Sequence, residues 1–208
     1  LSHGMLKDHA NWLYLASSAA KALGKSTKIL IDLQGPELRI GDISGYRTLK
    51  TDGNVIFGQR GIPVPEILLA QGKKGMRFLL DDGKMEVEVL ECNSSQMLAK
   101  VLRGGVLKSR KSITPEETVI ETPTLTAKDL ENLKIAGQYG VTGVMLPFVR
   151  SDQDLLCLRQ KLEENHSGHI KIFAKIENMQ GVEALDTFLP LADEIVIARG
   201  DLGNAVPL

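Results

Sequence analysis

The chain has 208 residues, of which 43% are hydrophobic and 25% charged, with a formal net charge of -1. This length and composition predict a folded domain with a sizeable core and room for a smaller insertion. The near-neutral charge gives no support for nucleic-acid binding, and no apolar run reaches the roughly 18 residues of a membrane span. Because the amino-terminal residues also lack a basic-then-apolar signal pattern, we expect a cytoplasmic protein.

The first predicted elements are a helix and a short buried strand. Residues 8–23 carry apolar side chains at helical spacing, and Gly24 is placed to end the helix. Residues 28–32 form a mostly apolar strand that ends at Asp32, just before the turn residues Gln34-Gly35-Pro36. Such a strand is typical of a sheet that is covered on both faces.

From about residue 41 to about residue 121 the hydrophobic period becomes that of β-strands. The predicted strands cover residues 55–57, 77–80, 85–90 and 97–102. Asp81-Asp82-Gly83 lies between two of them and predicts a tight hairpin turn, because these residues tolerate positive φ. We therefore expect a β-rich domain over residues 41–121, inserted into a domain made of residues 1–40 and 122–208. Cys92 and Cys157 show no pairing or metal pattern and are expected to be buried free thiols.

Strand and helix signals alternate again after Pro123. Thr126 and Asp129 predict a capping box, a strand follows at 143–146, and residues 151–154 predict the cap of another helix. Apolar strands are predicted at 170–174 and 194–198. Repeated strand–helix units predict an α/β fold with a parallel sheet, and about four units make half of a (β/α) TIM barrel.

Polar residues follow the last two predicted strands. Lys175 and Glu177 stand two residues apart, so both side chains face one side of a strand, and Asp201 follows the next strand in a glycine-flanked turn. Magnesium prefers oxygen ligands and takes one or two carboxylates, while an ammonium offsets the charge on a moving phosphoryl group. These residues predict a magnesium–phosphate site, although Lys-x-Glu at a strand end, taken by itself, is more often a solvated ion pair.

Motifs along nearly the whole chain resemble, in their order, those of pyruvate kinases. They are Ser2-His3-Gly4, Asp32 with Gly35-Pro36-Glu37-Leu38-Arg39, Asp81-Asp82-Gly83, Thr124 to Asp129, Phe148-Val149-Arg150, Lys175-Ile176-Glu177-Asn178 and Ala198-Arg199-Gly200-Asp201. The resemblance implies a partial TIM barrel with an inserted β-barrel lid domain. It also implies transfer of the phosphoryl group of phosphoenolpyruvate to ADP, giving pyruvate and ATP in glycolysis, by a homo-oligomer that is a tetramer in this family.

The resemblance also implies roles for individual residues near the substrate. Lys175 would stabilise the transferring phosphoryl group and the enolate, and Glu177 and Asp201 would hold magnesium or manganese. The backbone amides of Gly200 and Asp201 would take the substrate carboxylate.

Further residues are implied to bind potassium and phosphate. Ser2, Asp32 and the carbonyl of Leu33 would ligate potassium, and Glu37 resembles the acidic residue of potassium-dependent members. Arg39 and Lys111 would face nucleotide or substrate phosphates, and His3 would lie near the nucleotide. Taken alone, Asp32 also suits a turn cap, Ser2 a helix start, and Lys111 a solvated loop.

Some positions depart from the family pattern. Leu33, Gln34, Ser112 and Pro147 stand where the family usually has a threonine, a lysine, a glycine and a small polar residue. Motifs that flank this region in the family are not part of the sequence, so we expect a fragment that is inactive alone, whose outer strands leave edges open to another chain. Two alternatives stay open: a magnesium-dependent lyase or aldolase of the phosphoenolpyruvate/pyruvate barrels, and a non-catalytic binding fragment.

Overall fold

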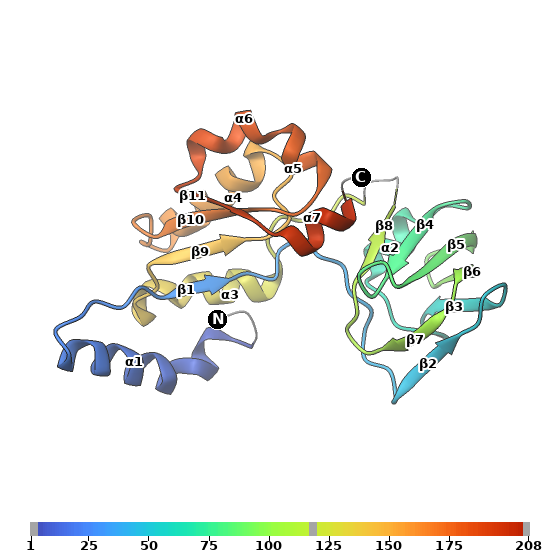
Figure 1. Ribbon diagram of the computed structural model, residues 1–208, viewed down its shortest axis with the longest axis horizontal. Helices are drawn as coiled ribbons and strands as arrows, with labels where there is room; N and C mark the ends of the chain where they lie inside the picture. Colours follow the sequence, from blue (N-terminus) through green and yellow to red (C-terminus); the bar gives the residue numbers. More distant parts are fainter. Residues whose placement is uncertain (1–3, 117–119, 206–208) are drawn as a thin grey trace. The chain divides into compact units, whose positions relative to one another are not determined.

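The computed structural model describes residues 4–116 and 120–205, which fall into two compact units (Figure 1). One unit combines the segment up to Pro36 with the segment from Pro123 onward, and the other unit is Glu37–Thr122. Each has a hydrophobic core of its own. The chain therefore leaves the first unit after its first strand and returns to it for the remaining ones.

The first unit is built on a parallel sheet of four strands in the order β1-β9-β10-β11. The strands are β1 (Leu30–Asp32), β9 (Gly143–Leu146), β10 (Lys171–Ile176) and β11 (Glu194–Ile197). The predicted α/β fold with a parallel sheet is confirmed. The described strands form an open sheet, and no closed barrel occurs among them.

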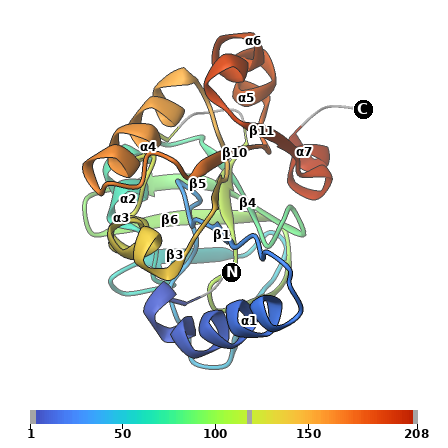
Figure 2. The ribbon, with the colours of Figure 1, turned by 90° about the vertical axis from the view of Figure 1, so that its left-hand side faces the viewer.

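Helices connect these strands and cover the sheet. They are α3 (Ala127–Ala136), α4 (Asp152–Glu164), α5 (Met179–Glu183), α6 (Leu185–Phe188) and α7 (Arg199–Ala205), with 3-10 turns η2 (Gly137–Tyr139) and η3 (Leu189–Leu191). Figure 2 shows α3 and α4 on the same side of the sheet. Leu133 of α3 and Leu158 of α4 are fully buried in one core with strand residues such as Val144 and Ile172. The core lies between these helices and the sheet, which leaves the carboxyl ends of the strands for polar groups.

The amino-terminal helix contributes little to this core. It begins with the 3-10 turn η1 (Leu6–His9) and continues as α1 (Ala10–Ala22). Gly24, which was predicted to stop the helix, follows shortly after and has φ +64°, a left-handed conformation typical of residues just beyond a helix. Leu13 is buried, but Trp12 is 73% exposed. The predicted helix is therefore confirmed, but most of the apolar side chains of α1 face away from the described core.

The two helix starts predicted after Pro123 have different outcomes. The capping box of α3 is confirmed: the hydroxyl of Thr126 accepts from the N–H of Asp129, and the Asp129 carboxylate accepts from the N–H of Thr126. At α4, Ser151 occupies the cap position but its side chain makes no capping hydrogen bond. The acidic side chain of Asp154 instead accepts from the backbone N–H of Arg150 at 2.9 Å.

The second unit is β-rich and antiparallel. A five-stranded sheet has the order β3-β6-β5-β4-β8, and β2 pairs separately with β7. The elements are β2 (Tyr46–Leu49), β3 (Asn54–Gly58), α2 (Glu66–Gln71), β4 (Arg77–Leu80), β5 (Met85–Cys92), β6 (Gln96–Arg103), β7 (Gly105–Lys108) and β8 (Ile113–Pro115). The sequence pattern did not predict β2, β7 and β8, which contain fewer consecutive apolar residues than the equally short strand β4, nor the six-residue helix α2.

The Asp81-Asp82-Gly83 turn between β4 and β5 is confirmed, with φ values of 49°, 55° and 80°. Ser112 stabilises this turn. Its hydroxyl accepts from the N–H of Asp82 at 2.9 Å and donates to the Asp82 carboxylate at 2.8 Å, and its carbonyl accepts from the N–H of Asp81. Two non-glycine residues at positive φ are thereby held by one serine.

Cys92 and Cys157 are free, as predicted, but both are half-buried rather than buried. No described helix has the length and apolar character needed to cross a membrane.

Candidate active site

The register of the parallel sheet brings Asp32 and Lys175 to one face. Asp32 pairs with Met145 on β9, and Met145 pairs with Phe173 on β10. Residues in register share a face, and so do residues two apart along a strand. Lys175 therefore projects from the same face as Asp32, across the intervening strand, and Glu177 follows just beyond the end of β10.

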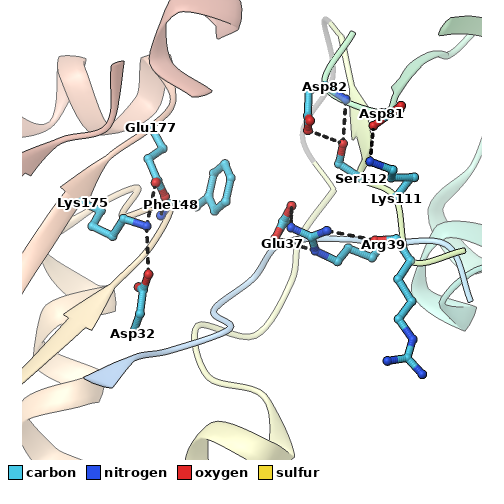
Figure 3. Close-up of polar contacts among 11 residues, drawn as sticks. Asp32, Glu37, Arg39, Asp81, Asp82, Lys111, Ser112, Phe148, Lys175 and Glu177 are labelled. Carbon is cyan, nitrogen blue, oxygen red and sulfur yellow. Dashed lines mark hydrogen bonds and ion pairs between the residues drawn. The ribbon is translucent and has the colours of Figure 1, made fainter. Parts of the chain in front are cut away.

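Lys175 is the centre of the resulting charged cluster (Figure 3). Its Nζ lies 3.0 Å from Oε1 of Glu177 and 3.5 Å from Oδ2 of Asp32. Burial alone would lower the pKa of Lys175, but the hydrogen bond and charge of Glu177, together with Asp32, raise it overall. Lys175 is thus held as an ammonium, suited to offset negative charge and unsuited to act as a base.

Glu177 is buried, with 1% of its side chain exposed, and both carboxylate oxygens have partners. Oε1 accepts from Lys175, and Oε2 accepts from the backbone N–H of Phe148 at 2.9 Å. Phe148 has φ +51°, an uncommon conformation for a residue with a side chain. The loop after β9 is therefore bent so that its amide fixes the carboxylate. Since an ionised carboxylate has about four acceptor sites, lone pairs remain for a metal.

Asp32 has a free acceptor in this cluster. Oδ2 is paired with Lys175, while Oδ1 is buried and has no hydrogen-bond partner among the described residues. Leaving a buried carboxylate oxygen without a partner is costly. The cluster also contains two carboxylates and one ammonium, which leaves an excess of negative charge. Both features fit an additional cation at this place.

Gly200 and Asp201 lie at the start of α7, the helix that follows β11. Both are exposed, and the Asp201 side chain forms no hydrogen bond or ion pair with any described residue. The first amides of a helix lack intrahelical partners and suit an anion. Within residues 4–116 and 120–205, no three His, Cys, Asp or Glu side chains are grouped for a metal.

Arg39 and Lys111 belong to the other unit, and each is paired there with a carboxylate. Arg39 forms a two-pronged ion pair with Glu37, at 2.8 and 2.9 Å, and Lys111 lies 2.8 Å from Asp81. The hydrogen bond and charge of Asp81 raise the pKa of Lys111. Lys111 is thereby held as an ammonium, and a phosphate would have to compete with Glu37 and Asp81 for Arg39 and Lys111.

The other predicted site residues are placed as follows. Leu33 is buried directly after β1, and its N–H donates to the carbonyl of Met145 at 3.0 Å. Ser2 and His3 lie outside the described residues, so their predicted roles remain predictions.

Sequence analysis did not identify the roles of two groups, one that bonds Glu177 and one that bonds Arg150 in the loop after β9. The amide of Phe148 is one, and only its place within the Phe-Val-Arg motif drew notice to it. The other is the Asp154 carboxylate, which is 4% exposed and accepts from Arg150 and from the hydroxyl of Thr124. Burial raises the pKa of Asp154, but the bonds from Arg150 and Thr124 outweigh it and lower the pKa overall.

Comparison with known proteins gives a consistent result. A family model described as "Pyruvate kinase, barrel domain" matches residues 1–208. A pyruvate kinase of Geobacillus stearothermophilus is 33% identical over an alignment that covers 99% of this chain and 37% of that protein. One from Agrobacterium vitis is 34% identical, covering 99% and 45%, and one from Clostridium acetobutylicum is 29% identical, covering 100% and 46%. The chain thus spans less than half the length of these relatives.

Proposed function

The chain belongs to the pyruvate kinase family, and from this premise we propose that the protein containing it transfers the phosphoryl group of phosphoenolpyruvate to ADP in glycolysis. Pyruvate and ATP would be the products. The observation that carries the proposal is the buried contact of Lys175 with Glu177 and Asp32 beside the carboxyl ends of a parallel sheet. That is the end of such a sheet where (β/α) barrels place their catalytic groups.

Lys175 would act on the charge of the moving group. The transfer breaks the bond between phosphorus and the enolate oxygen, while a terminal phosphate oxygen of ADP forms a new bond to phosphorus. Negative charge shifts to the enolate, which takes up a proton to become pyruvate. A fixed ammonium beside these oxygens stabilises the transition state without giving up its own proton, which fits the raised pKa of Lys175.

Glu177 and Asp201 would hold a divalent cation, magnesium or manganese. Such an ion, when bound, would neutralise phosphate and enolate oxygens. Glu177 retains acceptor sites after binding Lys175 and Phe148, and the Asp201 carboxylate has no other partner among the described residues. The first amides of α7, at Gly200 and Asp201, would orient the substrate carboxylate toward this ion.

Asp32 and the Leu33 carbonyl would bind potassium, with Ser2 as a further ligand. The support for this assignment is Oδ1 of Asp32, which is buried and has no hydrogen-bond partner within residues 4–116 and 120–205. Potassium would add positive charge to the cluster at the strand ends.

The inserted β-rich unit would act as the lid over the phosphates. Arg39 and Lys111 would leave Glu37 and Asp81 to meet substrate or nucleotide phosphates, and His3 would lie near the nucleotide. A lid excludes water from a phosphoryl group during transfer. Assembly into a homo-oligomer, a tetramer by family resemblance, is part of the same proposal.

A coupled assay tests the proposal. ADP phosphorylation from phosphoenolpyruvate is measured with magnesium and potassium for the 208-residue chain, for the natural protein that contains it, and for that protein with Lys175→Met. The proposal predicts turnover by the natural protein and its loss in the variant. Magnesium-dependent cleavage of a carbon–carbon bond instead would favour a lyase, and nucleotide binding without any turnover would favour a binding protein.

A further inference from the structure

Asp129 makes more hydrogen bonds than a helix cap requires. It is the third residue of α3 and is 1% exposed. Its Oδ2 accepts from the N–H and the hydroxyl of Thr126, as in a capping box. In addition, Oδ2 accepts from the N–H of Gly35 at 3.1 Å, and Oδ1 accepts from the N–H of Gln34 at 2.8 Å. The last two bonds stabilise nothing in α3.

These bonds join segments that are far apart along the chain. Gln34 lies 95 residues before Asp129, and the entire second unit is inserted between them. The chain leaves the first unit after Pro36 and returns to it at Pro123. The Asp129 carboxylate bonds Gln34 and Gly35 just before the exit and Thr126 just after the return, so it joins these two segments. All of these residues belong to the first unit.

The segment held by Asp129 is the one that carries Asp32 and Leu33. The other side of this segment is fixed by β9 and the loop after it, because the N–H of Leu33 donates to Met145 and Gly35 packs against Pro147. Gly35 has φ +61°, and a Cβ there would lie 2.6 Å from Cγ of Pro147. Only glycine fits this position, and the chain therefore has little freedom to move on that side.

Peptide planarity links Asp129 to the carbonyl of Leu33. The C=O of Leu33 and the N–H of Gln34 belong to one trans peptide unit, so they lie in one plane and point in opposite directions. When Oδ1 of Asp129 accepts from the N–H of Gln34, it also sets the direction of the Leu33 carbonyl. Oδ1 of Asp32, which has no hydrogen-bond partner in the part of the chain that the structure describes, belongs to the adjoining residue.

We propose that Asp129 is a positioning residue for a monovalent-cation site made by Asp32 and the Leu33 carbonyl. The inference rests on the proposed function, in which this pair holds potassium. Asp129 does not touch the ion. It fixes the peptide unit whose carbonyl would be a ligand, in the way that partners of metal ligands set their orientation.

The test compares Asp129→Asn with Thr126→Val in the natural protein. Asparagine has a single acceptor oxygen and presents an NH2 group to donors, so it loses the bonds to Gln34 or Gly35. Thr126→Val removes the hydroxyl of the helix cap and leaves those two bonds in place. Potassium binding is measured by calorimetry with KCl, and the amide hydrogen exchange of Gln34 and Gly35 is followed with and without KCl. The potassium concentration for half-maximal turnover is a third readout.

For Asp129→Asn we expect faster exchange at Gln34 and Gly35, and potassium affinity weaker by about 10–100-fold, while kcat at saturating potassium is largely retained. For Thr126→Val we expect lower stability with unchanged potassium affinity. Equal weakening in both variants, or normal affinity in Asp129→Asn, would overturn the proposal. Should Asp129→Asn not fold, Asp129→Glu keeps both acceptors but displaces them by one methylene group: faster exchange at Gln34 and Gly35 with weaker potassium affinity would support the proposal, and faster exchange with normal affinity would overturn it.

Failure of this proposal is distinguishable from failure of the proposed function. Absence of turnover in every form would reject the kinase, while calorimetry and exchange would still decide the role of Asp129. Normal turnover with a potassium affinity that is indifferent to Asp129→Asn would reject only the role of Asp129.

Discussion

Lys175 and Glu177 form a buried ion pair in which Nζ lies 3.0 Å from a carboxylate oxygen. Because only 1% of the Glu177 side chain is exposed, removing the ammonium leaves a buried carboxylate without its counter-charge. The residue proposed to stabilise the transition state is therefore also a structural partner. Experiments on this pair have to separate loss of activity from loss of stability.

Lys175→Met is expected to affect both properties. In the natural protein, turnover of phosphoenolpyruvate and ADP should fall by about 10²–10³ or more, because the charge aimed at the moving group is gone. The free energy of unfolding should fall by about 3–5 kcal/mol, since Glu177 and Asp32 lose their shared ammonium. The coupled assay and urea denaturation measure the two effects.

Lys175→Arg is the control, since it keeps the positive charge with a different shape. It should recover much of the stability and little of the turnover. Recovery of full turnover by arginine would show that charge alone, without the geometry of the ammonium, is sufficient.

Glu177→Gln is expected to weaken the use of divalent metal. Glutamine is similar in shape and its oxygen can still accept from Phe148 or Lys175, but the negative charge is lost. The magnesium concentration for half-maximal turnover should rise by at least about tenfold. Manganese binding, followed by paramagnetic resonance, gives a readout that does not depend on turnover.

Glu183→Gln is the matched control, because Glu183 is exposed on α5. It should leave metal affinity unchanged. Equal metal affinity in Glu177→Gln and Glu183→Gln would remove Glu177 from the metal site.

Asp154 predicts an acid-dependent loss of stability. Its pKa is lowered from the ordinary 3.8, because bonds from Arg150 and Thr124 outweigh the effect of burial. A carboxyl group with a lowered folded-state pKa stabilises the fold above its unfolded-state pKa, and this contribution is lost as the pH falls through the folded-state value. The free energy of unfolding should therefore decrease as the pH drops below about 4, and Asp154→Asn should show a shallower decrease.

The comparison is made by urea denaturation at several pH values between about 7 and 2.5. Asp152→Asn serves as the control, because Asp152 lies in the same helix and its described side-chain bonds go only to the neighbouring Gln153. Parallel pH profiles for Asp154→Asn and the unaltered protein would rule out the contribution of Asp154.

Ser112→Ala tests how the β4–β5 turn is held. Loss of the hydroxyl removes two hydrogen bonds to Asp82, which should cost about 1–3 kcal/mol because Ser112 is buried. The amides around Asp81 and Asp82 should exchange faster with solvent. Ser44→Ala, at an exposed position of the same unit, should change neither property. Unchanged exchange in Ser112→Ala would mean that backbone bonds suffice to hold the turn.

Local signals explain why much of the fold was predictable. The capping box of Thr126 and Asp129, the stop at Gly24 and the Asp81-Asp82-Gly83 turn each depend on a few neighbouring residues. The strands 77–80 and 143–146 have only four residues each, but each contains three consecutive apolar residues, so the sequence pattern was sufficient to predict them. β2 and β8 contain no such apolar run, and their residues are ordered by partner strands distant in sequence.

The sequence by itself determined the local part of the charged cluster: the two-residue spacing of Lys175 and Glu177, at the end of an extended strand, puts both side chains on one side of the chain. Only the tertiary structure decided what these side chains meet. Parallel pairing across β9 brings Asp32 to Lys175, and the bend at Phe148 supplies an amide to Glu177. Asp129 reaches Gln34 across an insertion of the whole second unit. Such contacts depend on strand order and chain crossings, which the pattern of neighbouring residues does not specify.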